Sequence, residues 1–247
     1  IHDFMKPLGF GQITGIDIPG EARGVLPSTD WKRRTYRRPE QQKWYAGETI
    51  SLGIGQGYNN FTMLQLANAT ATLAGGGTHH KPHLIKGHQD PKTGAFVAEP
   101  EPAGEPMGYK SENVATVLRA MVGVTQGGTS RAVFAGAPYL SGGKTGTAQA
   151  VTIGQNSRYN AARLSEYQRD HSLYIAFAPA DKPRIAVAAI VENAGFGALA
   201  AAPIVRRVMD YWVAGLAPNA EDMKAVQRGQ ATTPIGAPRP VSELPSP

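Results

Sequence analysis

The clearest pattern along the chain is a pair of short alternating apolar runs between Ser172 and Asn193. Apolar side chains recur at every second position in both runs, and an Asp-Lys-Pro turn at residues 181–183 separates them. A period of two matches a strand, in which neighbouring side chains point to opposite faces. The pattern therefore predicts a β-hairpin that is buried on at least one face.

Three segments show the spacing of amphipathic helices. The first follows Thr62, where Gln65 completes a capping box, and glycines 75–77 end it. The second begins at Ser111, the expected N-cap, and stops at the Thr-Gln-Gly-Gly-Thr-Ser stretch of residues 125–130. The third begins near Pro203, a residue type that a first helical turn tolerates. Its expected apolar stripe consists of Ile204, Val205, Val208, Met209 and Trp212.

The order of these elements predicts the fold class. β-Branched and glycine residues at 145–151 favour one further strand before the hairpin. Helices, a strand, a hairpin and a closing helix predict an α/β fold of the α+β type, in which helices flank an antiparallel sheet. Residues 1–45 and 78–108 are expected to be irregular, because Gly and Pro interrupt them. We predict one domain over residues 1–216 and a disordered Pro- and Ala-rich tail over residues 217–247.

Composition narrows the protein class. Apolar residues make up 41 % of the 247 positions, which is typical of a globular protein. No apolar run approaches the roughly 18 residues of a membrane-spanning helix. Cysteine is absent, which excludes disulfides and thiol chemistry and weakens any zinc hypothesis for the histidines of "HHKPH", residues 79–83. We expect neither a metal nor a cofactor.

A basic segment, "WKRRTYRR" at residues 31–38, supplies much of the net charge of +6. Basic residues interleaved with aromatic ones can bind single-stranded nucleic acid, but no other nucleic-acid-binding signature is present. A solvated surface segment is the favoured interpretation, since charge runs are commonly just that. Contact with an acidic wall polymer or anionic headgroups is the alternative. We therefore expect no nucleic-acid partner.

The stretch "SGGKTGTAQA", residues 141–150, combines one cation and two hydroxyls with very little side-chain bulk. Lys144 supplies a charge that can tune proton transfer near a serine. Thr145 and Thr147 supply hydroxyl donors suited to a carboxylate. Gly146 allows a ligand to approach the backbone closely. A strand with these residues at its edge can bind the carboxylate end of an extended peptide.

Three stretches together resemble the class B penicillin-binding proteins, whose third motif is K-T-G. They are "GETISLGIGQGYNNFTMLQLANATATLAGGG", "SGGKTGTAQ" and "HSLYIAFAPADKPRIAVAAIVENAGFGALAAAPIVRRVMDYW". The residues of "GIGQGYN" and "AAPIVRRVMDYW" resemble those of the elongation-type enzymes most closely. The resemblance covers roughly residues 1–215. It implies the fold shared by penicillin-binding transpeptidases and serine β-lactamases, here without its N-terminal part.

The resemblance also implies an activity, the cross-linking of peptidoglycan stem peptides by a serine D,D-transpeptidase. Lys144 would join the hydrogen-bond network around the serine, and Thr145 and Thr147 would hold the terminal carboxylate of a substrate or β-lactam, with Gly146 between them. The Thr147 N–H would contribute to the oxyanion hole. The implied partners are D-Ala–D-Ala stem peptides, β-lactam antibiotics, and a glycosyltransferase and scaffold proteins of the elongation machinery. The implied location is the bacterial inner membrane, with the catalytic domain in the periplasm and its anchor outside this chain.

The nucleophile motif S-x-x-K and the second motif S-x-N are expected upstream of Ile1. "SGGK" at Ser141 and "SEN" at Ser111 match them literally, but both lie in the wrong structural context, so we interpret them as coincidences. This chain alone is then expected to be inactive. A division-type transpeptidase, a β-lactamase or D,D-carboxypeptidase of the same fold, and a non-enzymatic binding module remain alternatives. "GIGQG" lacks the G-K-[ST] ending of a phosphate-binding loop and is expected to be a tight turn at the sheet edge.

Overall fold

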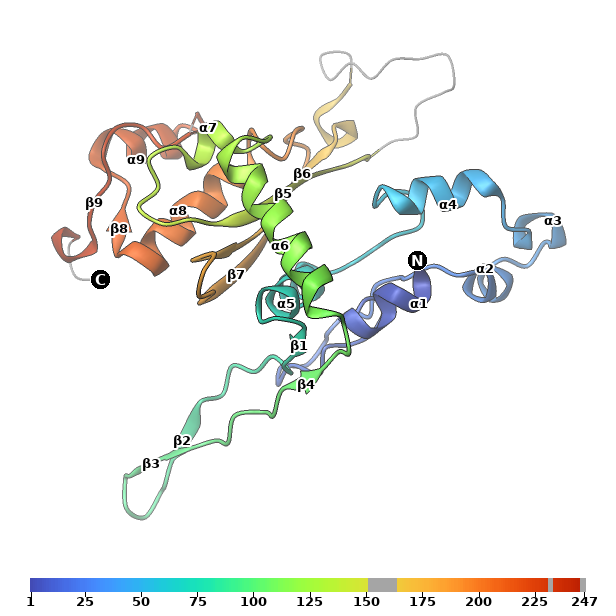
Figure 1. Ribbon diagram of the computed structural model, residues 1–247, viewed down its shortest axis with the longest axis horizontal. Helices are drawn as coiled ribbons and strands as arrows, with labels where there is room; N and C mark the ends of the chain where they lie inside the picture. The colour runs from blue at the N-terminus through green and yellow to red at the C-terminus, as the bar shows by residue number, and fades with distance from the viewer. Residues whose placement is uncertain (151–163, 231–232, 245–247) are drawn as a thin grey trace. The chain divides into compact units, whose positions relative to one another are not determined.

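The computed structural model describes residues 1–150, 164–230 and 233–244. The chain divides into two compact units, Ile1–Tyr109 and Lys110–Pro247 (Figure 1). The predicted boundary at residues 216/217 does not coincide with this division, in which the described residues after Leu216 fall within the second unit. None of the helices found along the described residues has the length and apolar character needed to cross a bilayer.

The first unit consists mainly of short helices. In chain order its elements are α1 (His2–Met5), η1 (Lys6–Leu8), α2 (Thr29–Thr35), α3 (Pro39–Gln42), α4 (Ala46–Gly53), α5 (Met63–Ala74), β1 (Thr78–His79), β2 (Gly87–Gln89), β3 (Phe96–Ala98) and β4 (Glu105–Pro106). Residues 1–45 are thus less irregular than predicted. The basic segment begins inside α2, where the Ser28 hydroxyl accepts a hydrogen bond from the Trp31 N–H and caps the helix.

The predicted helix after Thr62 is confirmed as α5. The Thr62 hydroxyl accepts from the Gln65 N–H, and the Gln65 side chain accepts from the Thr62 N–H, as a capping box requires. Gln65 is fully buried, and its amide also donates to the carbonyls of Gln12 (2.6 Å) and Arg23 (2.8 Å). One side chain therefore both caps α5 and ties two loops to it.

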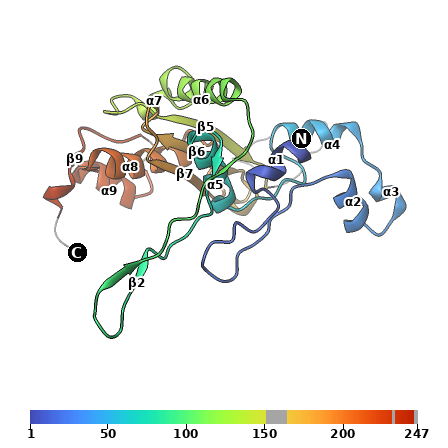
Figure 2. The same ribbon diagram turned by 60° about the horizontal axis from the view of Figure 1, so that its bottom comes forward.

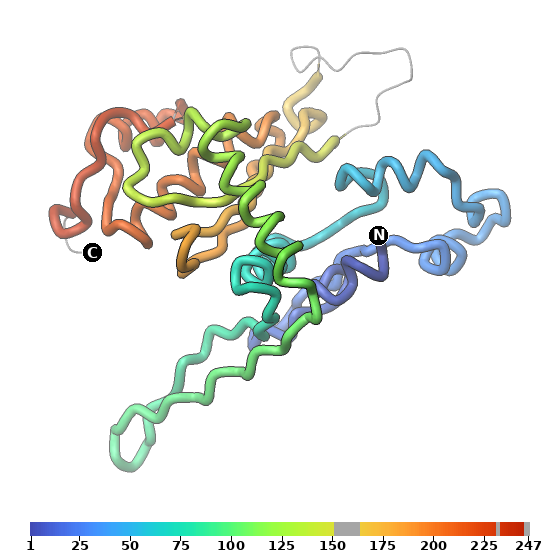
Figure 3. Tube along the Cα trace, viewed as in Figure 1, coloured from blue at the N-terminus to red at the C-terminus, as the bar shows by residue number. Residues whose placement is uncertain are grey.

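The excursion from Thr78 to Pro106 is a narrow antiparallel ribbon, visible in the trace of Figure 3. β1 pairs with β4 near its base, and β2 pairs with β3 towards its tip. The Asp17 carboxylate accepts from the N–H groups of Leu84 and Ile85, and these hydrogen bonds lower its pKa. The prediction of a loop-rich region holds for most of this segment, with two short strand pairs added.

The second unit is built around a three-stranded antiparallel sheet in the order β5-β6-β7. Its elements are α6 (Ser111–Gln126), α7 (Arg131–Phe134), β5 (Gly142–Ala148), η3 (Glu166–Gln168), β6 (His171–Ala178), β7 (Ile185–Val191), α8 (Ala201–Ala214), β8 (Leu216–Ala217), α9 (Ala220–Gln227), β9 (Arg239–Pro240) and η4 (Val241–Glu243). The predicted hairpin is confirmed as β6 and β7. β5 starts three residues before the prediction, and Val151 lies outside the described residues.

The two faces of the sheet are covered differently. Tyr174, Ala176 and Ala178 of β6 are fully buried in a cluster with the α8 residues Ala202, Val205 and Met209. The intervening side chains of β6, such as Phe177, point to the other face. Gly142 of β5 lies opposite Phe177, and a Cβ at Gly142 would lie 3.3 Å from the Met121 Cβ of α6, so α6 covers this face. α8 accordingly packs against β6 and β7, and α6 packs against β5 (Figure 2).

The predicted apolar stripe of the last helix is right at two of its five positions. Val205 and Met209 are buried, whereas Ile204, Val208 and Trp212 are exposed. The buried side of α8 carries small residues and the pair Arg206–Asp210 in their place. Because Arg206 and Asp210 neutralise each other there, two charged residues occupy positions that hydropathy alone assigns to solvent.

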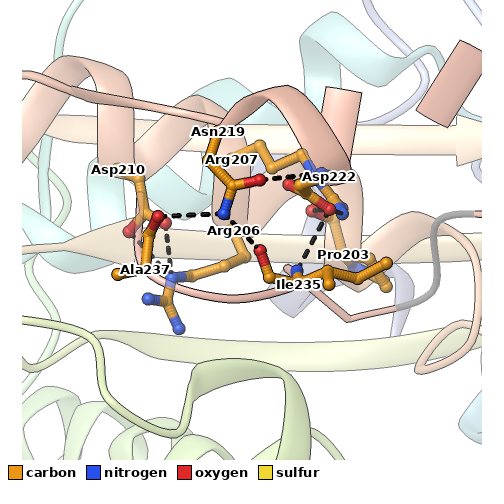
Figure 4. Close-up of polar contacts among 8 residues, drawn as sticks. All are labelled: Pro203, Arg206, Arg207, Asp210, Asn219, Asp222, Ile235 and Ala237. Atoms are coloured by element: carbon orange, nitrogen blue, oxygen red, sulfur yellow. Dashed lines mark hydrogen bonds and ion pairs between the residues drawn. The ribbon is translucent and has the colours of Figure 1, made fainter. Parts of the chain in front are cut away.

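The described part of the segment after Leu216 contains α9 and the β8–β9 pair, where the sequence predicts a disordered tail. Arg207 of α8 donates to both carboxylate oxygens of Asp222 in α9, at 3.0 and 2.6 Å (Figure 4). The Asn219 side chain caps α9 through the Asp222 N–H and donates to the carbonyls of Ile235 and Ala237. These polar contacts and the β8–β9 pair hold a segment whose composition alone is too poor in apolar residues to fold.

Candidate functional site

The K-T-G residues lie in β5, an edge strand of the sheet. Across the β5–β6 ladder, Lys144 is opposite Ile175, Thr145 opposite Tyr174, Gly146 opposite Leu173 and Thr147 opposite Ser172. Within the described part of the chain, no strand pairs with the outer edge of β5. An extended peptide can add to such an edge through its main chain.

Lys144 is exposed, and its ammonium group donates to the carbonyl of Thr145 at 2.7 Å. The cation thus folds over its own strand, at the edge where a peptide would add. Thr145, Gly146 and Thr147 are half-buried. The structure therefore brings all four predicted site residues together on one strand, as their adjacency in sequence requires.

A fifth residue joins the site from a distant part of the unit. The Thr129 Oγ1 lies 3.2 Å from the Thr145 Oγ1, within hydrogen-bond distance. Thr129 belongs to the stretch 125–130, which is predicted from sequence only as a helix end. Nothing local in that stretch indicates its neighbour, because 16 residues separate the two threonines.

Buried hydroxyls support the same corner of the sheet from beneath. The Ser130 hydroxyl and the Tyr174 phenol form a buried hydrogen bond of 2.7 Å, and Thr125 donates to the Ser141 carbonyl at 2.6 Å. Burial raises the pKa of Tyr174 to about 12, against a smaller lowering by the Ser130 hydrogen bond. The phenol therefore stays protonated at neutral pH and acts as a fixed structural partner.

Glycines allow the close approaches around this strand. A Cβ at Gly143 would lie 2.7 Å from the Tyr174 Cζ, so only glycine leaves room for the ring. A Cβ at Gly197 would lie 2.6 Å from the Gly146 carbonyl oxygen, so the loop before α8 approaches β5 at the centre of the motif. The missing side chain at Gly143 makes room for the Tyr174 ring, and the missing side chain at Gly197 lets the loop before α8 pack closely against Gly146.

Both literal matches to the nucleophile motifs lie in unsuitable places. Ser141 is only 2 % exposed at the start of β5, and its carbonyl is bound by Thr125. Ser111 is the first residue of α6, preceded by Lys110 at the N-cap, so the predicted Ser111 cap is wrong. Ser141 is thus buried directly before β5, and Ser111 is exposed in the first turn of α6; their interpretation as coincidences stays a prediction.

The basic segment is not simply solvated. Lys32 is 3 % exposed; its ammonium donates to the Glu48 carboxylate and to the Lys43 carbonyl. It also lies 5.9, 5.3 and 5.5 Å from the ring centroids of Trp44, Tyr45 and Tyr58. Arg33, Arg34, Arg37 and Arg38 remain exposed, as predicted for the segment as a whole.

The other sequence motifs form local structure in the first unit. Gly55 and Gly57 both have positive φ, so "GIGQG" is a tight turn, and it lies at the end of α4 in the first unit. His79 lies 3.3 Å from the Thr72 hydroxyl, and the His83 ring lies 3.1 Å from the Ile85 carbonyl. Across the described residues, no three histidine or acidic side chains gather in a way that would hold a metal ion.

The K-T-G strand and its sheet agree with a comparison against known families. The penicillin binding protein transpeptidase domain matches residues 1–210. The chain belongs to this transpeptidase family. A curated relative, the peptidoglycan D,D-transpeptidase MrdA of Acinetobacter baumannii, is 44 % identical over 214 residues, which cover 86 % of this chain.

Solved transpeptidase structures share the fold. Pseudomonas aeruginosa PBP2 in complex with WCK 5153 superposes with a TM-score of 0.68 at 41 % identity, covering 85 % of this chain and 43 % of that one. PBP2 of Helicobacter pylori in complex with MreC superposes with a TM-score of 0.62 at 26 % identity, covering 78 % of this chain and 31 % of that one. The present chain spans about a third of the length of the curated relatives it matches, 31 % for the Acinetobacter transpeptidase. The penicillin-binding fold class expected from the sequence is confirmed.

Proposed function

We propose that this chain is the K-T-G-bearing part of an elongation-type peptidoglycan D,D-transpeptidase. The observation that carries the proposal is the edge strand β5, on which Lys144, Thr145 and Thr147 lie along an edge that a stem peptide can pair with. Membership of the transpeptidase family and similarity to MrdA and PBP2 proteins support it.

The proposed reaction has two steps. A serine outside these 247 residues attacks the carbonyl carbon of the D-Ala–D-Ala peptide bond, and the terminal D-alanine leaves with a proton on its nitrogen. The resulting acyl ester is then attacked by an amine of a neighbouring stem peptide. A new amide forms, and the serine regains its proton.

Each site residue has a proposed role in these steps. Lys144 places its cation in the network that moves the serine proton. The Thr145 and Thr147 hydroxyls donate to the terminal carboxylate, and the absence of a side chain at Gly146 keeps the strand edge open to the peptide. The Thr147 N–H stabilises the oxyanion of the tetrahedral intermediate. β-Lactams occupy the same site, because they also carry a carbonyl and a carboxylate.

We further propose the setting of the enzyme: the periplasmic face of the bacterial inner membrane, anchored outside this chain. Its proposed partners are a glycosyltransferase and scaffold proteins of the elongation machinery. The complex of Helicobacter pylori PBP2 with MreC supports the scaffold proposal.

The test uses the complete protein that carries this chain. A fluorescent penicillin should form a stable adduct, detected by intact mass spectrometry, on a serine outside residues 1–247. Lys144→Ala should lower the acylation rate by about 100-fold or more, the scale of an acid–base contribution. Rapid loss of the adduct with penicillin turnover would identify a β-lactamase instead, and labelling of Ser141 or Ser111 would overturn the placement of the nucleophile.

A further inference from the structure

The loop that ends α6 holds Thr129 in a defined position. The N–H groups of Gly127 and Gly128 both donate to the Gly123 carbonyl at 3.0 Å, and the Ser130 N–H donates to the Val124 carbonyl at 3.3 Å. A Cβ at Gly128 would lie 2.8 Å from the Val124 Cα, so the loop needs glycine to turn this closely. The backbone on both sides of Thr129 is therefore fixed by hydrogen bonds.

Ser130, the residue after Thr129, fixes the position of this loop on the sheet. Ser130 is fully buried, and its hydroxyl bonds to the Tyr174 phenol at 2.7 Å. Tyr174 is the β6 residue directly opposite Thr145. The Tyr174 hydroxyl lies against Gly143, two residues before Thr145 on the same face of β5. The Ser130–Tyr174 bond thus holds the loop over β5, where Thr129 lies beside Thr145.

The two threonine hydroxyls then share one hydrogen bond, since Thr129 Oγ1 and Thr145 Oγ1 lie 3.2 Å apart. Each hydroxyl has one proton to donate and two lone pairs that accept. If Thr129 donates to Thr145, the Thr145 proton stays available for a third group. A carboxylate next to the strand is the acceptor that gains most from it, because hydrogen bonds to charged groups are the stronger ones.

We propose that Thr129 is a positioning residue of the carboxylate subsite: its hydroxyl donates to Thr145 and directs the Thr145 proton towards the carboxylate of the bound peptide or β-lactam. This inference rests on the proposed transpeptidase function. It adds a residue of the α6–α7 loop to the subsite formed by the K-T-G strand.

The test compares two ligands on the complete protein. Benzylpenicillin carries the carboxylate, and its methyl ester carries none. Thr129→Val keeps the shape of the side chain and removes the hydroxyl, so the Thr145 proton is no longer directed to the carboxylate. Acylation by benzylpenicillin should slow by about tenfold, because the Thr145 hydrogen bond to a charged group is weakened or lost. Acylation by the methyl ester should be unchanged, and Thr129→Ser should restore the benzylpenicillin rate.

Two further variants separate positioning from simple damage. Thr116→Val removes an exposed hydroxyl on α6 that bonds only within its own helix, and it should leave both rates unchanged. In a Thr145→Val background, Thr129→Val should have no additional effect, because its partner is already lost.

The outcomes distinguish the two proposals. If the wild-type protein is acylated but Thr129→Val slows both ligands equally, or slows neither, the positioning role is wrong and the transpeptidase proposal stands. If the wild-type protein forms no adduct with benzylpenicillin, the transpeptidase proposal fails and the role of Thr129 fails with it.

Discussion

Lys32 of the first unit and Lys144 of the second unit are both lysines of motifs that stand out in the sequence, but the fold places them in opposite environments. Lys32 lies buried against three aromatic rings and the Glu48 carboxylate, whereas Lys144 lies exposed on an edge strand. A buried ammonium group needs partners that replace water, and only the first unit supplies them. Lys32 therefore has a structural role, and Lys144 is left accessible for chemistry.

The contrast extends to the two units as wholes. The second unit buries one face of its sheet under α8, with Tyr174, Ala176, Val205 and Met209 fully buried. The buried cluster of the first unit is smaller, Leu8, Phe10, Leu26 and Ala69, and polar side chains such as Gln65 and Lys32 link its loops. The first unit thus depends on polar and aromatic contacts where the second depends on apolar packing.

The largest expected effect is loss of the buried charge pair in the second unit. Asp210 accepts from Arg206 at 2.7 and 2.9 Å and from the Tyr139 phenol at 2.7 Å. Asp210→Ala leaves Arg206 buried without its counter-ion and should lower the free energy of unfolding by about 3–5 kcal/mol. Urea denaturation with hydrogen exchange in β6 and α8 measures this. Asp181→Ala, in the exposed hairpin turn, is the control. A loss below about 1 kcal/mol would mean that apolar packing alone sustains this unit.

The second prediction compares the two lysines directly. Lys32→Met should destabilise the first unit by about 3 kcal/mol, because Glu48 loses its cation in a largely buried site. Lys144→Met should change stability by less than about 0.5 kcal/mol, as for an exposed surface residue. Thermal unfolding measures both changes, with hydrogen exchange in α2 and α4 for Lys32→Met and in β5 and β6 for Lys144→Met. Arg34→Met, an exposed change in the same helix as Lys32, serves as the matched control. Equal effects of the two lysine changes would remove the distinction between them.

The third prediction concerns pH and the first unit. Burial tends to raise the pKa of Glu48, but hydrogen bonds from Lys32, the Tyr45 N–H and Tyr58 outweigh it, so the pKa lies below the ordinary value of 4.5. A carboxyl with a lowered folded pKa stabilises the fold above pH 4.5, and this contribution disappears as the pH falls through the folded pKa. Urea midpoints should therefore fall between about pH 6 and about pH 3.

Glu48→Gln sharpens the pH prediction. It should lower stability at about pH 6 and flatten the dependence on pH between about 5 and 3, since the titrating group is gone. Glu40→Gln, an exposed acid on α3, should keep the wild-type slope. A wild-type slope in Glu48→Gln would assign the acid sensitivity to other carboxyls, such as Glu21, whose pKa is also lowered by hydrogen bonds from Thr14 and Gly15 against the opposing effect of burial.

The smallest expected effect falls on the C-terminal segment. Asn219→Ala removes the cap of α9 and two hydrogen bonds to Ile235 and Ala237, at a cost of about 1 kcal/mol. Limited proteolysis should then cleave within residues 220–240 sooner than in the wild type. Gln227→Ala, at the exposed end of α9, should leave cleavage unchanged. If wild type and Asn219→Ala are cut equally fast, the segment behaves as the tail that composition predicted.

Prediction from sequence succeeded where the decisive contacts are local. The capping box joins Thr62 and Gln65, which are three positions apart, and the period-two runs of β6 and β7 need only a short turn between them. It failed where a long-range partner changes the preference of a residue. Arg206 is buried because Asp210 and the carbonyls of Val133 and Ala135 accept its hydrogen bonds.

The candidate site divides in the same way. Lys144, Thr145, Gly146 and Thr147 are adjacent in the chain, so the motif and its strand could be recognised without a structure. Thr129 could not, because its approach to Thr145 depends on the turn after α6 and on the Ser130–Tyr174 bond across 44 residues.

The sequence by itself determined the transpeptidase family, the α5 helix, the hairpin and the K-T-G motif, since each can be recognised from short stretches of consecutive residues. Only the tertiary structure decided that Lys32 is buried while Lys144 is exposed, that the segment after Leu216 folds onto α8, and that Thr129 meets Thr145. The physical reason is that hydrogen bonds and ion pairs between residues distant in sequence form only after the chain has folded. Local propensity does not contain the information about which distant residues become partners.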